Sequence, residues 1–298
     1  MNILQRTLKN AVLLRGIGVH SGADAQVYLK PAPQNHGIIF ECTDAFGAKH
    51  RFAATLENLR EHSYATTLGN SEAHVRTIEH LMAAIAALSL DNLLIEVIGG
   101  EVPIMDGSSA LFYDALQKAG YISQAALRQY IRIIHPIRVD FPIGFVEFSP
   151  SNGCRFEVEI FFESRHIKRQ SYNFDLTTDD FGKEIAPART FGFKKDAELL
   201  FKNGLACGSS LENSIIIDTK DEILNNKALR FDNEFVRHKL LDAIGDTALL
   251  GLPFIGTFRS YCSGHKYNAA AVRAILETPS CYEIVKFSQE DVNLKAGA

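Results

Sequence analysis

Two stretches of this 298-residue chain share one order of predicted elements, and this order limits the possible folds more than any other feature. In each stretch a helix with a histidine near its start leads into a strand that ends in a glycine-containing loop. The helices are predicted over residues 75–88 and 233–250, where apolar residues recur on one face of a 3.6-residue period. The two stretches share too little identity to be called a repeat. We therefore expect an α+β fold of two similar domains that meet at a cleft.

The boundary between the domains is predicted at residues 123–129. Residues 1–125 would form the N-terminal domain and residues 126–298 the C-terminal domain. A short turn is predicted at residues 189–192, before a helical segment at 194–203. The other predicted helix covers residues 111–118, and the strands are predicted at 25–29, 37–41, 93–98, 130–139, 144–148, 155–162, 214–218 and 254–261.

Composition excludes several classes of protein. The chain has 31 basic and 35 acidic residues, a net charge of −4, whereas nucleic-acid-binding proteins usually carry a basic excess. The longest apolar stretch, residues 81–90, is far shorter than the ~20 residues that cross a bilayer. Five widely spaced cysteines without a C-x-x-C pair argue against a disulfide framework or a cysteine zinc site and favour the cytoplasm. With 20 Phe and no Trp, Phe would line any large apolar pocket.

Two pairs of residues on the predicted helices could bind a metal. His238 and Asp242 are four residues apart, so both side chains lie on one helix face and can occupy two corners of a zinc site. An exposed His–Asp pair has the same spacing, and that interpretation is the more common one when the pair is taken alone. Glu79 and His80 could supply a base and a third ligand, although most Glu-His pairs on helices are solvated. Two histidines and a carboxylate are a common ligand set of hydrolytic zinc sites, so each pair strengthens the other.

A further histidine, His265, lies in a glycine-flanked turn at a predicted strand end. Asp246 is one helical turn beyond Asp242 and eight residues, or ~12 Å, from His238, which is too far to share a metal with it. It could instead orient His265 and raise its pKa. The segment around Thr190 and Phe191 could equally be an ordinary turn with buried Phe.

A series of segments occurs in one order over nearly the whole chain, the longest and most specific being FVRHKLLDAIGD at 235–246. The others are GIGVHSG (16–22), VRTIEHLMAA (75–84), DNLLIEV (91–97), PIMDGS (103–108), ARTFGF (188–193), LRFD (229–232) and SGH (263–265). Together they resemble the UDP-3-O-acyl-N-acetylglucosamine deacetylases, the zinc amidases of lipid A biosynthesis in Gram-negative bacteria.

The resemblance implies a role for each candidate residue. The zinc ligands would be His80, His238 and Asp242. Glu79 would be the general base, His265 the acid and Asp246 its orienting partner, while Lys239 and Thr190 would lie near the developing oxyanion. The resemblance also implies substrate contacts from Phe191, Phe193, Lys239, Val19 and His20.

The resemblance further implies that each domain layers a sheet with a helix pair, with the zinc at the domain interface. An insert at about residues 193–214 would form a passage for the substrate acyl chain. Its candidate wall residues are Phe193, Leu199, Leu200 and Leu205.

The activity implied is hydrolysis of the N-acetyl group of an acylated UDP-sugar by a cytoplasmic, monomeric enzyme. Zn²⁺ is the expected cofactor, and Fe²⁺ suits the same ligand set. Two alternatives remain open at this point. One is a binding module that keeps the fold without the chemistry, and the other is a zinc amidase for a different N-acyl sugar or peptide.

Overall fold

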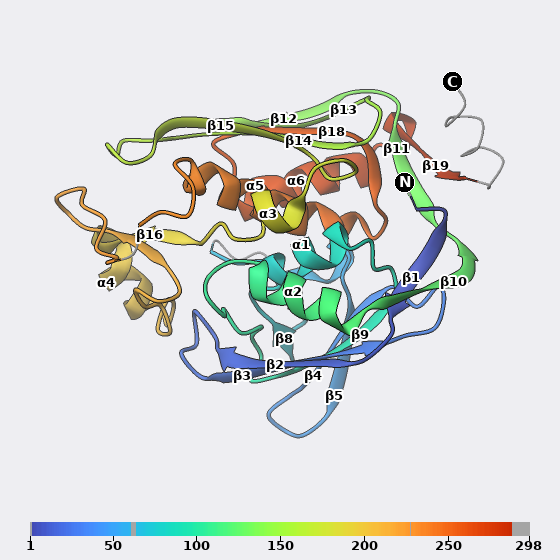
Figure 1. Cartoon of the computed structure of the whole chain (residues 1–298), viewed down its shortest axis with the longest axis horizontal. Coiled ribbons are helices and arrows are strands. Elements are labelled where there is room, and N and C mark those ends of the chain that lie inside the picture. The colour runs from blue at the N-terminus through green and yellow to red at the C-terminus, as the bar shows by residue number, and fades with distance from the viewer. Residues whose placement is uncertain (1, 61–63, 227, 288–298) are drawn as a thin grey trace.

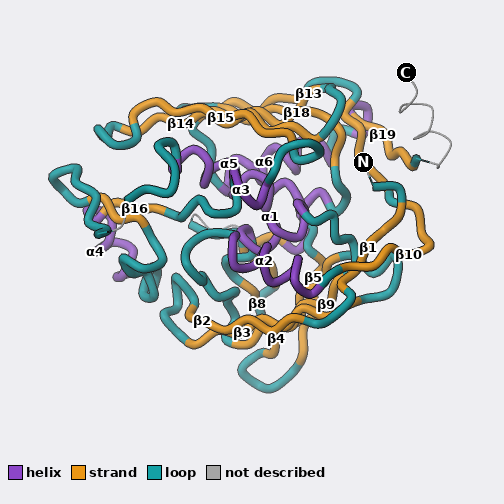
Figure 2. The backbone as a smooth tube through the Cα atoms, in the orientation of Figure 1, coloured by secondary structure: helices purple, strands orange, loops and turns teal. Residues whose placement is uncertain are grey.

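The computed structural model describes residues 2–60, 64–226 and 228–287 (Figure 1). Two β-sheets form the outer layers, and most of the helices lie between them (Figure 2). The fold is therefore α+β, as the alternation of predicted strands and helices indicates. No helix among the described residues is long and apolar enough to cross a membrane.

The first half of the chain builds the lower sheet of Figure 1. Its five strands have the order β2-β3-β9-β4-β5, and β4 and β9 run parallel. Helices α1 and α2 cover it. The elements are β1 (Leu4–Leu8), β2 (Val12–Ile17), β3 (Asp24–Pro31), β4 (Ile38–Thr43), β5 (Lys49–Ala53), η1 (Leu56–Asn58), β6 (Leu59–Arg60), β7 (Thr67–Gly69), β8 (His74–Val75), α1 (Glu79–Ala87), β9 (Leu93–Ile98), α2 (Ala110–Ala119) and β10 (Tyr121–Leu127).

The second half builds a seven-stranded sheet with the path β12-β13-β18-β11-β19, in which β14 also pairs with β18 and with β15. Helices α5 and α6 cover its inner face (Figure 1). The elements are β11 (Gln129–Ile133), β12 (Ile137–Asp140), β13 (Phe145–Ser149), β14 (Cys154–Phe162), β15 (Lys168–Asp175), α3 (Phe181–Glu184), β16 (Phe191–Phe193), α4 (Lys194–Lys202), β17 (Ile215–Ile217), α5 (Glu234–Thr247), η2 (Ala248–Leu250), β18 (Phe254–Tyr261), α6 (His265–Leu276), η3 (Pro279–Cys281) and β19 (Tyr282–Lys286).

Several segments differ from their predicted structure. The first long helix starts at Glu79 and not at residue 75, because His74 and Val75 pair with β7 and Thr77 adopts a left-handed φ of 59°. The turn predicted at 189–192 contains the start of a strand, since Phe191–Phe193 pairs in parallel with β17. The single strand predicted at residues 130–139 is two strands, β11 and β12. Residues 123–129, the predicted domain boundary, contain the end of β10, which pairs with β1, and the start of β11, which joins the second sheet.

The helices α1 and α5 pack against each other at the centre of the molecule. A Cβ atom on Gly245 would lie 2.1 Å from the carbonyl oxygen of Glu79, so only glycine allows this approach. Seven consecutive residues of α1, Glu79 to Ile85, are buried, which is why its apolar face appears so broad in the sequence. This crossing brings the start of α1 against the middle and the last turn of α5, from a distant part of the chain.

Many of the abundant Phe residues lie in the hydrophobic core. Six of them are fully buried: Phe40, Phe112, Phe148, Phe156, Phe235 and Phe258. Among the described residues, a cavity of about 690 Å³ has Phe156 and Phe254 in its lining. Two sheets that pack against one helical layer need large apolar side chains to fill the space between the layers.

Candidate active site

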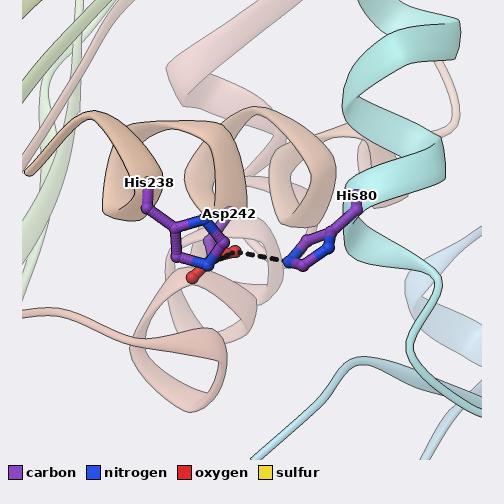
Figure 3. A group of neighbouring side chains, drawn as sticks. All are labelled: His80, His238 and Asp242. Carbon is purple, nitrogen blue, oxygen red and sulfur yellow. Dashed lines mark ion pairs between the residues drawn. The ribbon is translucent and has the colours of Figure 1, made fainter. Parts of the chain in front are cut away.

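Three buried side chains converge where α1 and α5 cross (Figure 3). His80 comes from the first turn of α1, and His238 and Asp242 lie one turn apart on α5. The Oδ1 atom of Asp242 is 3.4 Å from Nε2 of His238 and 3.6 Å from Nε2 of His80. One potential ligand atom from each residue lies within 4.8 Å of the others, a spacing suited to a shared metal ion.

Hydrogen bonds orient this cluster toward a common point. Nδ1 of His238 donates to the carbonyl oxygen of Ala188 at 3.1 Å, which leaves the Nε2 lone pair free. Oδ2 of Asp242 accepts from Nζ of Lys239 at 2.9 Å. Oδ1 of Asp242 is buried without a hydrogen-bond partner among the described residues. A buried carboxylate oxygen without a donor is costly, and a metal ion would satisfy it.

The protonation states also fit a metal site. Burial lowers the pKa of His238 to about 3, so its imidazole is neutral at pH 7 and available as a ligand. Burial alone would raise the pKa of Asp242, but His238 and Lys239 hold it well below its ordinary value. His238 therefore presents a neutral imidazole and Asp242 an ionised carboxylate, the forms that bind metal.

Glu79 precedes His80 and is equally buried, at 3% exposed. Its Oε2 atom accepts the backbone N–H of Thr66 at 3.0 Å, and its Oε1 atom is 3.8 Å from Nε2 of His265. Burial raises the pKa of Glu79. A carboxylate with a raised pKa beside a metal cluster can accept and return a proton near neutral pH.

His265 and Asp246 are in direct contact, as the sequence interpretation proposed. Nδ1 of His265 is 2.9 Å from Oδ2 of Asp246, and this oxygen also accepts from the side-chain amide of Asn268. Oδ1 of Asp246 accepts from the hydroxyl of Thr66. Burial alone would lower the pKa of His265, but the charges of Asp246 and Glu79 raise it to about 10. His265 is therefore protonated at neutral pH and can donate a proton from Nε2.

Lys239 and Phe191 lie beside the cluster. The ring of Phe191 meets the His238 ring at 6.3 Å and the Phe235 ring at 5.0 Å between centroids. Nζ of Lys239 is 5.6 Å from the centre of the Phe191 ring. Burial alone would lower the pKa of Lys239, but Asp242 raises it, so the ammonium stays charged. A cation and an aromatic face thus border the potential metal position.

Other candidates lie further from the three ligands. Thr190 is half-buried, and its backbone N–H donates to the carbonyl of Gly107 at 2.7 Å. It is two residues beyond Ala188, whose carbonyl orients His238. Among the described residues no hydrogen bond joins the Thr190 side chain to the cluster, so its role stays a prediction. Phe193 packs against Phe162 at 5.7 Å between ring centroids.

The predicted insert is a β16–α4–β17 unit that projects from the body of the molecule (Figure 1). Its helix buries no residue, and Leu199 is 60% exposed, whereas Leu200 and Leu205 are half-buried. The insert contacts the segment that contains Val19 and His20: the carbonyls of these two residues accept the N–H groups of residues 208 and 207 at 3.0 and 3.1 Å.

Several supporting residues carry no signal in the sequence. Thr66 holds both Glu79 and Asp246, although 180 residues separate Thr66 from Asp246. The buried pair Arg189–Glu234, 2.8 Å apart, fixes the segment whose Ala188 carbonyl orients His238. Such contacts join distant parts of the chain and leave no local pattern. The one available signal is that Arg189 directly precedes the candidate Thr190 in the sequence.

An α+β fold with a buried His–His–Asp cluster next to a glutamate defines a potential metal-dependent hydrolase. Residues 5–277 match the family model for UDP-3-O-acyl N-acetylglycosamine deacetylase. The chain is 47% identical over 286 residues to curated proteins of Brucella ovis, Brucella canis and Brucella suis named UDP-3-O-acyl-N-acetylglucosamine deacetylase. These alignments cover 96% of this chain and 100% of each relative. The chain belongs to this deacetylase family.

Proposed function

We propose that this protein removes the N-acetyl group from UDP-3-O-acyl-N-acetylglucosamine and releases acetate and the free amine, a step of lipid A biosynthesis. The observation that carries the proposal is the buried cluster of His80, His238 and Asp242 with Glu79 beside it. Family membership supports the choice of substrate. A binding module that had lost the chemistry would not need to retain both the ligand set and the adjacent carboxylate.

His80, His238 and Asp242 would hold the metal through Nε2, Nε2 and Oδ1. We propose Zn²⁺, and the same ligands also suit Fe²⁺. When bound, the ion would supply Lewis acidity and lower the pKa of water. The unpartnered Oδ1 of Asp242 and the low pKa of His238 support this assignment.

The remaining side chains would move protons and stabilise charge. Glu79 accepts a proton from the attacking water. Lys239 and Thr190 donate to the developing oxyanion. His265, held by Asp246, gives a proton to the departing amine. Alternatively, Glu79 performs both transfers and His265 only stabilises charge.

These two mechanisms differ in their pH–rate profiles. If His265 is the acid, His265→Ala removes the alkaline limb of the profile, whereas Glu79→Ala removes the acidic limb. An unchanged alkaline limb in His265→Ala would exclude the acid role and favour Glu79 as the only proton carrier.

The substrate would extend from this site along the second half of the chain. We propose that Phe191 contacts the sugar and that Lys239, Val19 and His20 border the same space. Phe193 with Leu199, Leu200 and Leu205 would form the passage for the acyl chain. The exposed apolar side chain of Leu199 supports this assignment.

The two-domain division at residues 1–125 and 126–298 is also a proposal, supported by the passage of the chain from β10 with its partner β1 to β11 in the second sheet. We propose a monomer, since one chain supplies all three potential ligands. The five unpaired cysteines support a cytoplasmic location.

Acetate release tests the proposed substrate directly. The metal-loaded protein is incubated with UDP-3-O-acyl-N-acetylglucosamine and, separately, with UDP-N-acetylglucosamine that lacks the acyl chain. We expect acetate from the acylated substrate and at least about ten times less from the other, because the acyl chain supplies binding energy. Equal turnover of both, or acetate from neither, would refute the proposed substrate.

A further inference from the structure

The side chain of Glu101 is 2% exposed and lies outside the metal cluster. Its Oε1 atom accepts the backbone N–H of His20 and the hydroxyl of Thr77, each at 2.9 Å. Its Oε2 atom accepts the N–H and the hydroxyl of Ser21, at 2.9 and 2.7 Å. Four donors on one buried carboxylate are enough to hold it ionised, and they lower the pKa of Glu101 although burial alone would raise it.

These four hydrogen bonds join two parts of the proposed site. Thr77 is two residues before Glu79 and three before His80, in a left-handed conformation with a φ of 59°. A β-branched residue rarely adopts this conformation, so the bond to Glu101 helps to hold it. His20 and Ser21 belong to the turn of residues 18–21, which the sequence interpretation places next to the substrate.

A second contact joins this turn to the insert. The carbonyls of Val19 and His20 accept the N–H groups of Gly208 and Cys207, and Nδ1 of His20 accepts the N–H of Ala206 at 3.4 Å. We call residues 206–208 the insert loop. The turn thus has Glu101 on one side and the insert loop on the other.

Glycines allow both contacts. A Cβ atom on Gly18 would lie 2.1 Å from Oε2 of Glu101, and one on Gly208 would lie 2.2 Å from the Gly18 carbonyl oxygen. A side chain at position 18 would therefore push the turn away from Glu101, and one at position 208 would push the insert loop away from the turn. This requirement explains part of the GIGVHSG motif at residues 16–22, to which no metal ligand belongs.

The turn also lies within electrostatic reach of the proposed acid. Burial lowers the pKa of His20, Glu101 opposes this effect, and the charges of Arg76 and, to a smaller extent, His265 add to the lowering.

We propose that Glu101 is a positioning residue of the proposed deacetylase site. It fixes the turn of residues 18–21 against the start of α1, and this turn supports the insert loop. Through this chain of contacts Glu101 sets the position of the acyl passage relative to Glu79 and His80. The proposal rests on the proposed function for its kinetic consequence, but its structural consequence is independent of any substrate.

The kinetic consequence falls mainly on substrate binding. Glu79 is held separately by Thr66, and His238 by Ala188, so the metal cluster keeps its shape when Glu101 changes. In Glu101→Gln an NH₂ group replaces one carboxylate oxygen and faces one backbone N–H and one hydroxyl. The hydroxyl can turn and accept from the amide, but the backbone N–H loses its acceptor. We expect KM for the acylated substrate to rise about tenfold or more while kcat changes less than about threefold.

Three variants of the metal-loaded full-length protein test the proposal. Gly208→Ala leaves Glu101 intact and separates only the insert loop from the turn, so its KM should also rise. Ser21→Ala removes one donor and keeps three, and it serves if Glu101→Gln does not fold. The control is Glu41→Gln, because Glu41 is a similarly buried glutamate (4% exposed) of the first half that pairs with Lys49 and Arg51, away from the site.

Kinetics and amide hydrogen exchange are measured on each variant. We expect faster exchange at residues 19–21 and 206–208 in Glu101→Gln, at 206–208 in Gly208→Ala, and at neither in Glu41→Gln. Unchanged exchange at 206–208, or an unchanged KM in an active protein, would overturn the proposal. Absence of acetate release from the wild-type protein would instead refute the proposed function, and the exchange result would still decide whether Glu101 holds the insert loop.

Discussion

Single residues at this site act through pairs with other side chains. His265 is an example, because its protonation depends on Asp246, nineteen positions earlier. Asp246 supplies the largest contribution that raises the pKa of His265. The histidine therefore stays protonated through neutral pH and loses its proton only under alkaline conditions.

Asp246→Asn should move the alkaline limb of the pH–rate profile toward lower pH. Loss of the Asp246 charge lowers the pKa of His265, so the protonated form disappears earlier as the pH rises. We expect kcat at pH 8–9 to fall about 100-fold, the usual contribution of a general acid. The profile of kcat between pH 5 and 10 measures this shift. An alkaline limb at the wild-type pH would show that Asp246 does not set the charge of His265.

Glu234→Gln should weaken both the fold and the metal site. Glu234 is fully buried and pairs with Arg189, so the variant leaves a buried cation without its counter-ion at a cost of about 3–5 kcal/mol. The neighbouring Ala188 carbonyl orients His238, so metal affinity should fall about 10–100-fold.

Urea unfolding and competition with a chelator measure these two effects. Glu283→Gln is the matched control, because Glu283 forms an exposed pair with Arg132, which contributes at most about 1 kcal/mol. Wild-type metal affinity in Glu234→Gln would contradict the role of this pair.

The sequence predicts the residues of the site better than the residues that hold them in place. His238 and Asp242 are four apart on a helix, and this local spacing suffices to predict their common face. Thr66, by contrast, reaches Asp246 through a contact between residues 180 positions apart, and nothing in its neighbourhood in the sequence indicates it. Glu101 is missed for the same reason.

Among the elements, the crossing of α1 and α5 decides whether the ligands meet. The two helices carry all three ligands, and Gly245 allows them to approach at the Glu79 carbonyl. Strands β9 and β18 have the bounds that the alternation predicts, 93–98 and 254–261. The start of α1 does not, because strand pairing of Val75 overrides a helical pattern of apolar residues.

Gly245→Ala should separate the two helices. The added methyl group would lie 2.1 Å from the Glu79 carbonyl oxygen, and such overpacking costs about 1–3 kcal/mol. Alanine favours a helix over glycine by about 1 kcal/mol, so the net loss of stability is small. The loss of metal affinity should be larger, since His80 moves away from His238. Metal affinity equal to that of the wild-type protein would contradict this account of the crossing.

At the scale of the whole molecule, the site exists only when both halves of the chain are folded together. His80 belongs to the first half and His238 and Asp242 to the second, and both halves share one hydrophobic core. The sequence predicts two α+β halves with one histidine-bearing helix each. It does not predict how the insert contacts the turn of residues 18–21, because that contact is made mostly by backbone atoms.

The central claim is that one metal ion bound by His80, His238 and Asp242 makes this chain a deacetylase. The most direct test is a titration of the metal-free protein with Zn²⁺, followed by acetate release from UDP-3-O-acyl-N-acetylglucosamine. We predict that activity rises linearly to one equivalent of Zn²⁺ and that His238→Gln neither binds the ion tightly nor releases acetate. Full activity of the metal-free protein, or of His238→Gln, would contradict the account.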